Sequence, residues 1–184
     1  LGNSPDPLDL IEKYSADGVR TGMLFCSPAG NDLPFDEKLC EQGRNFTNKI
    51  WNALRLVKGW EISHDSPLTT HDSIFIWFEN KLELLKENLE KSYASYRLSE
   101  ALMDLYKFIW DDFCSWYLEF VKPPFGEKID AVSYQKTILY FEELMKLLHP
   151  FMPFISEEIY HYLHKSESDG ENESTDIVVA TYPK

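Results

Sequence analysis

Residues 35–60 read FDEKLCEQGRNFTNKIWNALRLVKGW, and their pattern predicts a long amphipathic helix. At about 100° per residue, five apolar side chains fall within one narrow sector that can pack against a core. They are Leu39, Phe46, Ile50, Ala53 and Val57. An adjoining sector holds basic side chains and amides with one acid, Glu41, among them: Lys38, Asn45, Asn48, Lys49, Asn52 and Arg55. Lysine and arginine neutralise phosphates and asparagine matches base edges, so we expect this sector to contact a polyanion.

The charge of this stretch is opposite to that of the whole chain. The 184 residues include 18 basic and 31 acidic side chains, a net charge of −13. Residues 35–60 hold five basic and three acidic side chains, a net charge of +2, so the remainder sums to −15. A polar helix face is usually only solvated surface, but a local reversal of sign indicates a bounded electrostatic footprint. Wholesale coating of nucleic acid or of an anionic membrane is not expected of so acidic a chain.

The remaining sequence predicts further helices, which together indicate an all-α bundle of antiparallel helices. Apolar residues keep helical spacing from Pro7, over 16–26, from about Ser73 to an irregularity near Tyr96, over 99–121 and over 131–148. A proline-kinked corner comes next, and Ser156 is expected to cap a last helix. Residues 166–175 are polar and acidic, and residues 177–179 are predicted to form a short strand or an extended tail.

Two groups of polar side chains suggest catalysis or metal binding, and neither is expected to support it. Asp111 and Asp112 are adjacent, so on a helix they point about 100° apart and do not converge on one substrate. Ion pairing or solvation is the better interpretation. His161 and His164 could share a helix face, but no third ligand is spaced to join them, so with His149 they read as surface or structural histidines. We therefore expect neither catalytic residues nor a metal site.

The three cysteines indicate the compartment. Cys26, Cys40 and Cys114 are widely spaced and follow no metal-binding pattern, so they read as buried thiols in a reducing environment. No secretory leader opens the chain, and no apolar run reaches the ~18 residues of a membrane span. A cytoplasmic, monomeric protein with no membrane partner is expected.

Four ordered motifs carry a resemblance to a known family. Residues 43–57, GRNFTNKIWNALRLV, closely resemble the helix that opens the anticodon-binding domain of class I valyl-tRNA synthetases. Residues 1–25 are similar to the segment that comes directly after the Lys-Met-Ser-Lys-Ser signature loop of these enzymes. WDDFCSWYLE at 110–119 and LHPFMPFISEEIY at 148–160 match later landmarks of the same domain. Isoleucyl and leucyl relatives share the bundle, but the RNF-x-NK-x-WNA pattern is closer to the valyl branch.

The resemblance implies a fragment of a larger enzyme. The parent would attach valine to its tRNA with ATP and magnesium, and would clear mischarged threonine at an editing site. The resemblance places a connector at 1–34, the helical anticodon-binding domain at 35–165, and a flexible acidic segment with a short strand or tail at 166–184. The fragment alone is expected to be inactive, to hold no cofactor, and to bind the anticodon loop and inside corner of valine tRNA beside the missing catalytic domain.

The family also implies which side chains meet the RNA. Four residues carry over by position in the motif as lining the anticodon pocket: Lys38, Lys49, Arg55 and Leu56. We add three amides from helix geometry, with capping of backbone groups inside the bundle as their alternative role: Asn45, Asn48 and Asn52. Some relatives place an aromatic at the position of Leu56, whereas leucine offers an apolar contact without a π face. Arg44 and Trp51 lie off the basic sector and are expected to pack against neighbouring helices.

A second hypothesis comes from a different class of protein. An acidic helical module could use the same polar helix to bind a protein instead of an RNA. Salt distinguishes the two, because RNA binding weakens steeply as salt rises, whereas a hydrophobic protein interface changes little.

Overall fold

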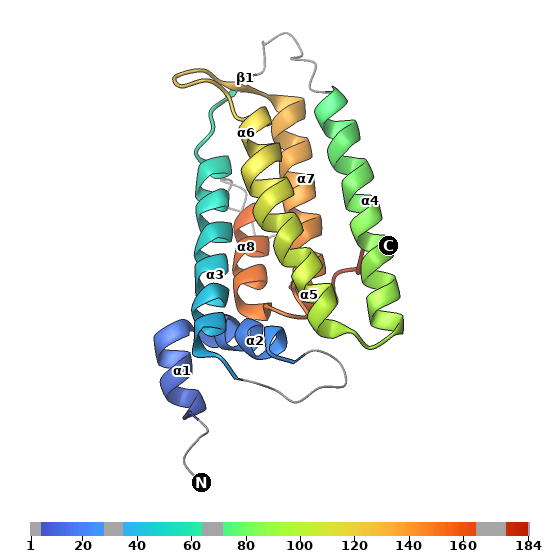
Figure 1. Cartoon of the computed structure of the whole chain (residues 1–184). Coiled ribbons are helices and arrows are strands. Elements are labelled where there is room, and N and C mark those ends of the chain that lie inside the picture. The colour runs from blue at the N-terminus through green and yellow to red at the C-terminus, as the bar shows by residue number, and fades with distance from the viewer. Residues whose placement is uncertain (1–4, 28–34, 64–71, 165–175, 184) are drawn as a thin grey trace.

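The computed structural model describes residues 5–27, 35–63, 72–164 and 176–183, and its long helices run alternately up and down (Figure 1). Two short strands pair in parallel at one end of this bundle. The all-α class expected from the sequence is therefore confirmed. The elements are α1 (Pro7–Tyr14), α2 (Ala16–Phe25), α3 (Glu37–Lys58), β1 (Ile62–Ser63), α4 (Asp72–Ala94), α5 (Leu98–Lys107), the π-helix η1 (Phe108–Tyr117), α6 (Leu118–Val121), β2 (Ile129–Asp130), α7 (Ala131–Leu148), α8 (Pro153–His164) and the 3₁₀-helix η2 (Ile177–Val179).

Helix α3 forms where the sequence predicts it and is capped at both ends. The Asp36 carboxylate accepts a hydrogen bond from the Lys38 amide at 3.0 Å, which satisfies one of the amides left free at a helix N-terminus. Gly59 follows the last turn as its C-terminal cap. The predicted apolar sector faces the core, with Leu39 half-buried and the others buried: Phe46, Ile50, Ala53 and Val57.

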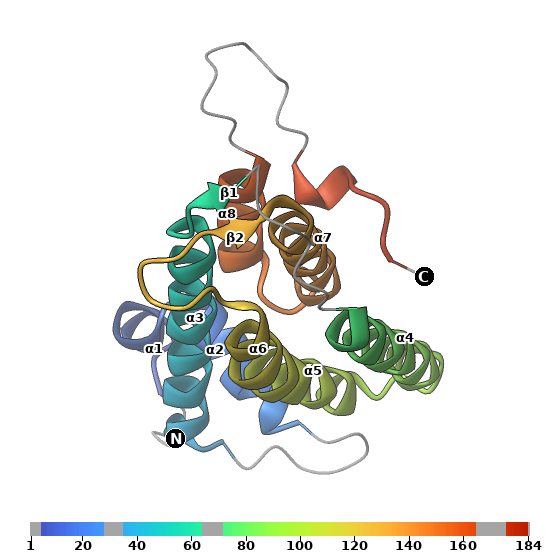
Figure 2. The same cartoon turned by 90° about the horizontal axis from the view of Figure 1, so that it is seen from above.

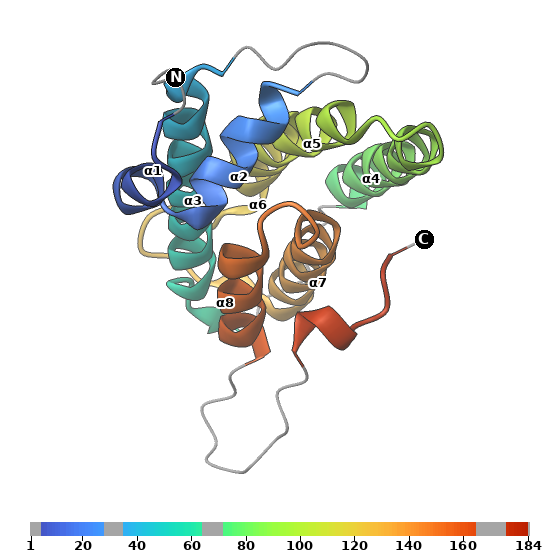
Figure 3. The same ribbon diagram turned by 90° about the horizontal axis from the view of Figure 1, so that it is seen from below.

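Helices α1 and α2 cross the foot of α3, and glycines bring α2 into backbone contact with it (Figure 3). A Cβ atom at Gly22 would lie 2.6 Å from both the amide nitrogen and the sulfur of Cys40. A Cβ atom at Gly43 would lie 2.6 Å from the carbonyl oxygen of Gly18. Neither separation leaves room for a side chain, so the crossing requires glycine at these two positions. The crossing holds the first turns of α3 in a fixed relation to α2.

The corner before α8 is held from α2, which corrects the expected role of Ser156. The buried Asp17 carboxylate accepts hydrogen bonds from the Ile155 amide at 2.7 Å and the Phe154 amide at 3.4 Å. The free amides of the first turn of α8 are therefore satisfied by a side chain from another helix. Ser156 lies buried inside that turn and donates its hydroxyl to the Met152 carbonyl oxygen. The prediction that Ser156 caps α8 is wrong.

A π-helix replaces part of the single α-helix that the periodicity predicts over 99–121. This element, η1, is ten residues long and lies between α5 and α6. The Ser115 hydroxyl donates to the Trp110 carbonyl oxygen five residues earlier, at 2.9 Å. Phe113 and Tyr117 of η1 are buried and stack with their ring centroids 5.7 Å apart. Because π-helical turns are often found at functional sites, the surroundings of η1 bear on the search for the binding surface.

The link between α4 and α5 and the C-terminal residues were also predicted from the sequence. The irregularity expected near Tyr96 is confirmed, since this residue adopts a φ of 56° between α4 and α5. Residues 177–179 form η2 with Ile177 buried, so of the two predicted alternatives, a short strand or an extended tail, the strand is not formed there. The acidic segment 166–175 lies outside the described residues. No helix in the described ranges is both long and apolar enough to cross a lipid bilayer.

Candidate nucleic-acid interface

The predicted site residues lie along one side of α3, and we call this set the α3 polar face. Six of the side chains are exposed and Lys49 is half-buried. Leu56, with 41% of its surface exposed, lies one turn beyond Asn52 and adds an apolar contact to the polar set. The members are Lys38, Asn45, Asn48, Lys49, Asn52, Arg55 and Leu56.

Four of the five cations of α3 differ from most other cations of the described residues because they form no ion pair there, whereas the fifth, Arg44, lies 3.9 Å from Glu41. Lys81 on α4 lies 2.8 Å from Asp112, and Lys136 on α7 lies 2.7 Å from Glu79. Within the described ranges, no carboxylate forms an ion pair with four of the α3 cations, namely Lys38, Lys49, Arg55 and Lys58. Unneutralised cations that share one helix leave a positive strip that a phosphate backbone can contact.

The three amides of the α3 polar face are also unused by the rest of the described chain. Asn45, Asn48 and Asn52 are exposed, and no hydrogen bond joins their side chains to another described residue. The alternative role in capping backbone groups is therefore not seen in this part of the chain. Each amide keeps a donor and an acceptor available, the combination that pairs with a base edge.

Lys49 is positioned by an aromatic residue that sequence reasoning did not connect with it. Its Nζ atom lies 5.1 Å from the ring centroid of Trp110 in η1, within the range of a cation–π contact. Trp110 in turn stacks on Tyr106 at 5.6 Å and lies 6.4 Å from Phe46. These three aromatic rings pack together, and the Trp110 ring holds the Lys49 ammonium group at the boundary between α3 and η1. The pairing joins positions 61 residues apart, counted from the two residue numbers, so no local pattern could have revealed it.

The two residues placed off the basic sector pack as expected. Arg44 donates from Nη1 to the Lys13 carbonyl oxygen at 3.3 Å, and its guanidinium carbon lies 5.6 Å from the Tyr14 ring centroid. Trp51 meets Tyr162 of α8 edge to face, with ring centroids 5.3 Å apart. Both side chains fasten α3 to its neighbours and do not belong to the polar face.

Acidic side chains gather on a different side of the bundle. Figure 2 shows α4 across the bundle from α3. Exposed acids on α4 include Glu83, Glu87 and Glu90. The separation leaves the α3 polar face free of neighbouring carboxylates from α4 and makes the opposite side repel phosphates.

The candidate catalytic groups behave as the sequence predicts. Asp112 is engaged by Lys81 while Asp111 is exposed, so the adjacent carboxylates diverge. All three thiols are free and buried: Cys26, Cys40 and Cys114. Burial raises the pKa of Cys114 to about 12, which keeps this thiol protonated near neutral pH. The Asp112 ion pair and the divergence of the two carboxylates match the interpretation made from the sequence.

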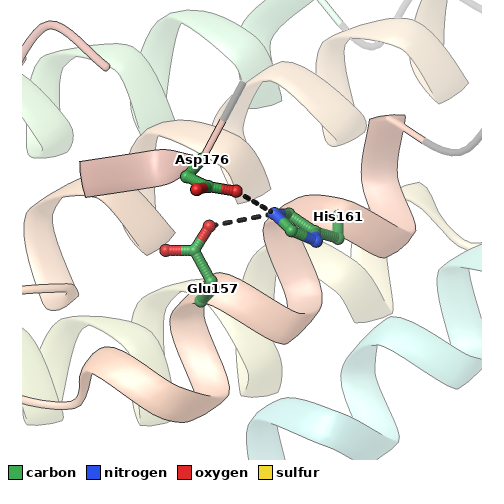
Figure 4. A group of neighbouring side chains, drawn as sticks. All are labelled: Glu157, His161 and Asp176. Atoms are coloured by element: carbon green, nitrogen blue, oxygen red, sulfur yellow. Dashed lines mark hydrogen bonds and ion pairs between the residues drawn. The ribbon is translucent and has the colours of Figure 1, made fainter. Parts of the chain in front are cut away.

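His161 lies beside two carboxylates, and the sequence did not predict the second of them. His161 Nε2 lies 3.0 Å from a carboxylate oxygen of Glu157 and 3.2 Å from one of Asp176 (Figure 4). Asp176 follows His161 by 15 residues, beyond any helical spacing, so it was not expected there. The Ile177 amide also donates to Glu157 at 2.9 Å. The three side chains could hold a divalent cation, and in the described chain they already join η2 to α8.

Known proteins share this sequence over most of the fold. A family profile described as "Anticodon-binding domain of tRNA ligase" matches residues 76–184. Curated relatives named "Valine--tRNA ligase" also align over α3. The Phocaeicola vulgatus protein is 54% identical over 172 residues, which is 94% of this chain and 20% of the relative. The Parabacteroides distasonis protein is 51% identical over 185 aligned positions, 100% of this chain and 21% of the relative.

A more distant relative has the same name. The Bacillus thuringiensis subsp. konkukian "Valine--tRNA ligase" is 40% identical over 194 aligned positions, covering 100% of this chain and 21% of the relative. The chain therefore spans about a fifth of the length of the curated relatives that it matches.

Proposed function

The chain belongs to the anticodon-binding domain family of tRNA ligases, and on that premise we propose that the α3 polar face binds the anticodon loop of valine tRNA. Membership of this family implies tRNA binding in general. The choice of valine tRNA is supported by relatives named for valine that are 40–59% identical. The observation that carries the proposal is the strip of cations without ion pairs and amides without hydrogen-bond partners among the described residues, on a chain of net charge −13.

The roles we propose follow from the chemistry of each side chain. Lys38, Lys49 and Arg55 neutralise phosphates or donate to base edges, and Lys58 extends the same strip by one turn. The three asparagines pair with base edges, and Leu56 provides an apolar contact. Valine anticodons share a central adenine and a following cytosine. A protein reads such loop bases once they are unstacked and turned outward, which suits an exposed helix face.

We extend the proposal to the longer protein of which this domain would be part. That protein would be a valine–tRNA ligase that uses ATP and magnesium, and its catalytic and editing residues would lie outside this chain. Residues 1–34 would serve as a connector, 35–165 as the anticodon-binding domain, and 166–184 as a tail. A monomer in the cytoplasm fits the three free, buried thiols.

Titration with two RNAs tests the proposal. We expect the chain to bind valine tRNA more tightly than a version altered at the two shared anticodon bases, because each mismatched contact loses a hydrogen-bonded pair. Equal binding of both RNAs would contradict anticodon recognition. A preference for isoleucine or leucine tRNA would assign the domain to another branch of the family. Binding of a protein partner that is insensitive to salt would support the interaction-module hypothesis instead.

Two substitutions test the assigned face. Lys49→Ala and Arg55→Ala should each weaken tRNA binding by roughly 1–3 kcal/mol if the side chains meet bases or desolvated phosphates. Lys81→Ala is the matched control, because it removes one charge from an exposed lysine that is already paired with Asp112 on another side of the bundle. Equal loss in all three variants would indicate a non-specific effect of net charge.

A further inference from the structure

Phe125 stands in solvent at the end of α3 where the polar face finishes. It lies in the loop between α6 and β2, and Figure 1 places this loop beside the C-terminal end of α3. The side chain has a relative exposure of 107%, the largest value for a large hydrophobic residue in the described part of the chain. The ring therefore contributes nothing to the core and is free to contact a partner.

The loop and the end of α3 together form a hollow. Its volume is about 310 Å³, at the lower end of the range for pockets that take small ligands. Gly59, Trp60 and Glu61 line it from the segment that directly follows the end of α3 at Lys58. The hollow therefore lies directly beyond the C-terminal end of α3, where the Glu61 carboxylate is paired with Lys128 at 3.3 Å. From the loop it is lined by Pro123, Pro124, Phe125, Gly126 and Glu127.

The loop is held in place, so Phe125 is presented at a defined position. Its far end is anchored where the Ile129 amide donates to the Glu61 carbonyl oxygen at 2.9 Å, next to the pairing of β1 with β2. Gly126 turns the chain with a φ of 82°, a conformation that glycine adopts without strain. The Glu127 amide donates to the Pro124 carbonyl oxygen at 3.0 Å and closes the turn that carries the ring.

We propose that Phe125 is a stacking platform for one unstacked base of the RNA loop that the α3 polar face binds, an inference that rests on the proposed function. An exposed aromatic ring stacks on any base, because every base has a π face. Leu56 offers no such face, so Phe125 supplies what the polar face lacks. Arg55 and Lys58 lie within the last turn of α3, where they can neutralise the phosphates beside the stacked nucleotide.

Substitutions at Phe125 separate stacking from simple hydrophobic contact. Phe125→Ala and Phe125→Leu should each weaken binding of valine tRNA to the 184-residue chain by roughly five- to 150-fold, the range that corresponds to one lost base stack. Phe125→Trp should retain binding. Phe154→Ala is the matched control, because Phe154 is 66% exposed and lies at the α2–α8 corner. The unfolding midpoint should not move in any of these variants, since neither ring is buried.

A fluorescent base gives a second readout. Anticodon stem-loops that carry 2-aminopurine at successive loop positions should show one position whose fluorescence changes most on binding, and Phe125→Leu should alter the bound-state fluorescence at that position alone. If Lys49→Ala and Arg55→Ala weaken binding but Phe125→Ala and Phe125→Leu do not, the stacking inference is overturned and the proposed function stands. If none of the four variants changes binding, the proposed function itself fails. Equal losses in Phe125→Leu and Phe154→Ala would also overturn the inference, as would equal losses in Phe125→Trp and Phe125→Leu.

Discussion

Removing one unpaired cation from α3 should make tRNA binding less dependent on salt, by the amount that one phosphate contact contributes. The cations are Lys38, Lys49, Arg55 and Lys58, and none is paired with an acid among the described residues. On a single-stranded loop, each phosphate contact contributes about −0.7 to the slope of log association constant against log salt, so four contacts give about −2.8. Between 50 and 200 mM salt, that slope predicts a roughly fiftyfold loss of affinity. Each alanine variant should make the slope shallower by about 0.7.

Fluorescence anisotropy of labelled valine tRNA over several salt concentrations measures this slope directly. A cation that contacts a base edge instead of a phosphate should lower the affinity and leave the slope nearly unchanged, so the variants also sort the four side chains by role. Lys81→Ala should change neither quantity, because Lys81 is paired with Asp112 and lies on α4. The reasoning would be refuted by a wild-type slope near zero, or by alanine variants of all four α3 cations that match the wild type in both slope and affinity.

Three further predictions concern the framework that positions α3. Asp17→Ala should lower the free energy of unfolding, measured by urea titration, by about 2 kcal/mol, because the Ile155 amide loses its acceptor. If the free energy falls no more than in a variant with a neutral surface substitution, Asp17 is not the cap of α8. Gly22→Ala should lower the free energy of unfolding by about 1–3 kcal/mol or more in the same titration, because the added Cβ atom would overlap the backbone of Cys40. An unchanged unfolding midpoint would show that α2 can move away from α3. The Cys114 thiol should not react with a thiol reagent at pH 8 in the folded chain, because burial raises its pKa to about 12. Below that pH the fraction of thiolate should rise tenfold per pH unit. Rapid labelling of Cys114 at pH 8 without denaturant would disprove this prediction.

The helices and the exposed polar side of α3 could be predicted because both depend on local periodicity. In α3 the apolar positions recur every three or four residues, and this spacing alone separates a buried side from an exposed one. The same spacing aligns Lys38, Asn45 and Asn52 on the polar side, and all three are exposed. Burial of the predicted apolar residues and exposure of the polar ones result from one cause, the 3.6-residue turn.

The features that the sequence did not reveal depend on partners distant in the chain. Asp17 caps α8 by accepting from the Ile155 amide, 138 residues further along the chain. Rules that consider only neighbouring residues could not identify Asp17, and they pointed to Ser156 instead. The contact between Lys49 and Trp110 likewise joins two separate helices. The π-helix differs from an α-helix in its hydrogen-bonding register while using the same kinds of residues, so apolar spacing predicted a helix there but not its type.

The separation of charge offers a physical reason why an acidic domain can still select one RNA. Acids on α4 lie across the bundle from α3. At physiological ionic strength their field decays over about 8 Å. They would therefore weaken the attraction between the α3 cations and a bound RNA only slightly. During approach, those acids disfavour every orientation that brings phosphates to the wrong side. Several lysines elsewhere, among them Lys81 and Lys136, are held in ion pairs, so their charge is neutralised. On the proposed function, the four unpaired cations of α3 would direct the RNA to the side where the amides can contact its bases, and the lysines neutralised elsewhere would contribute to specificity by offering less competing charge.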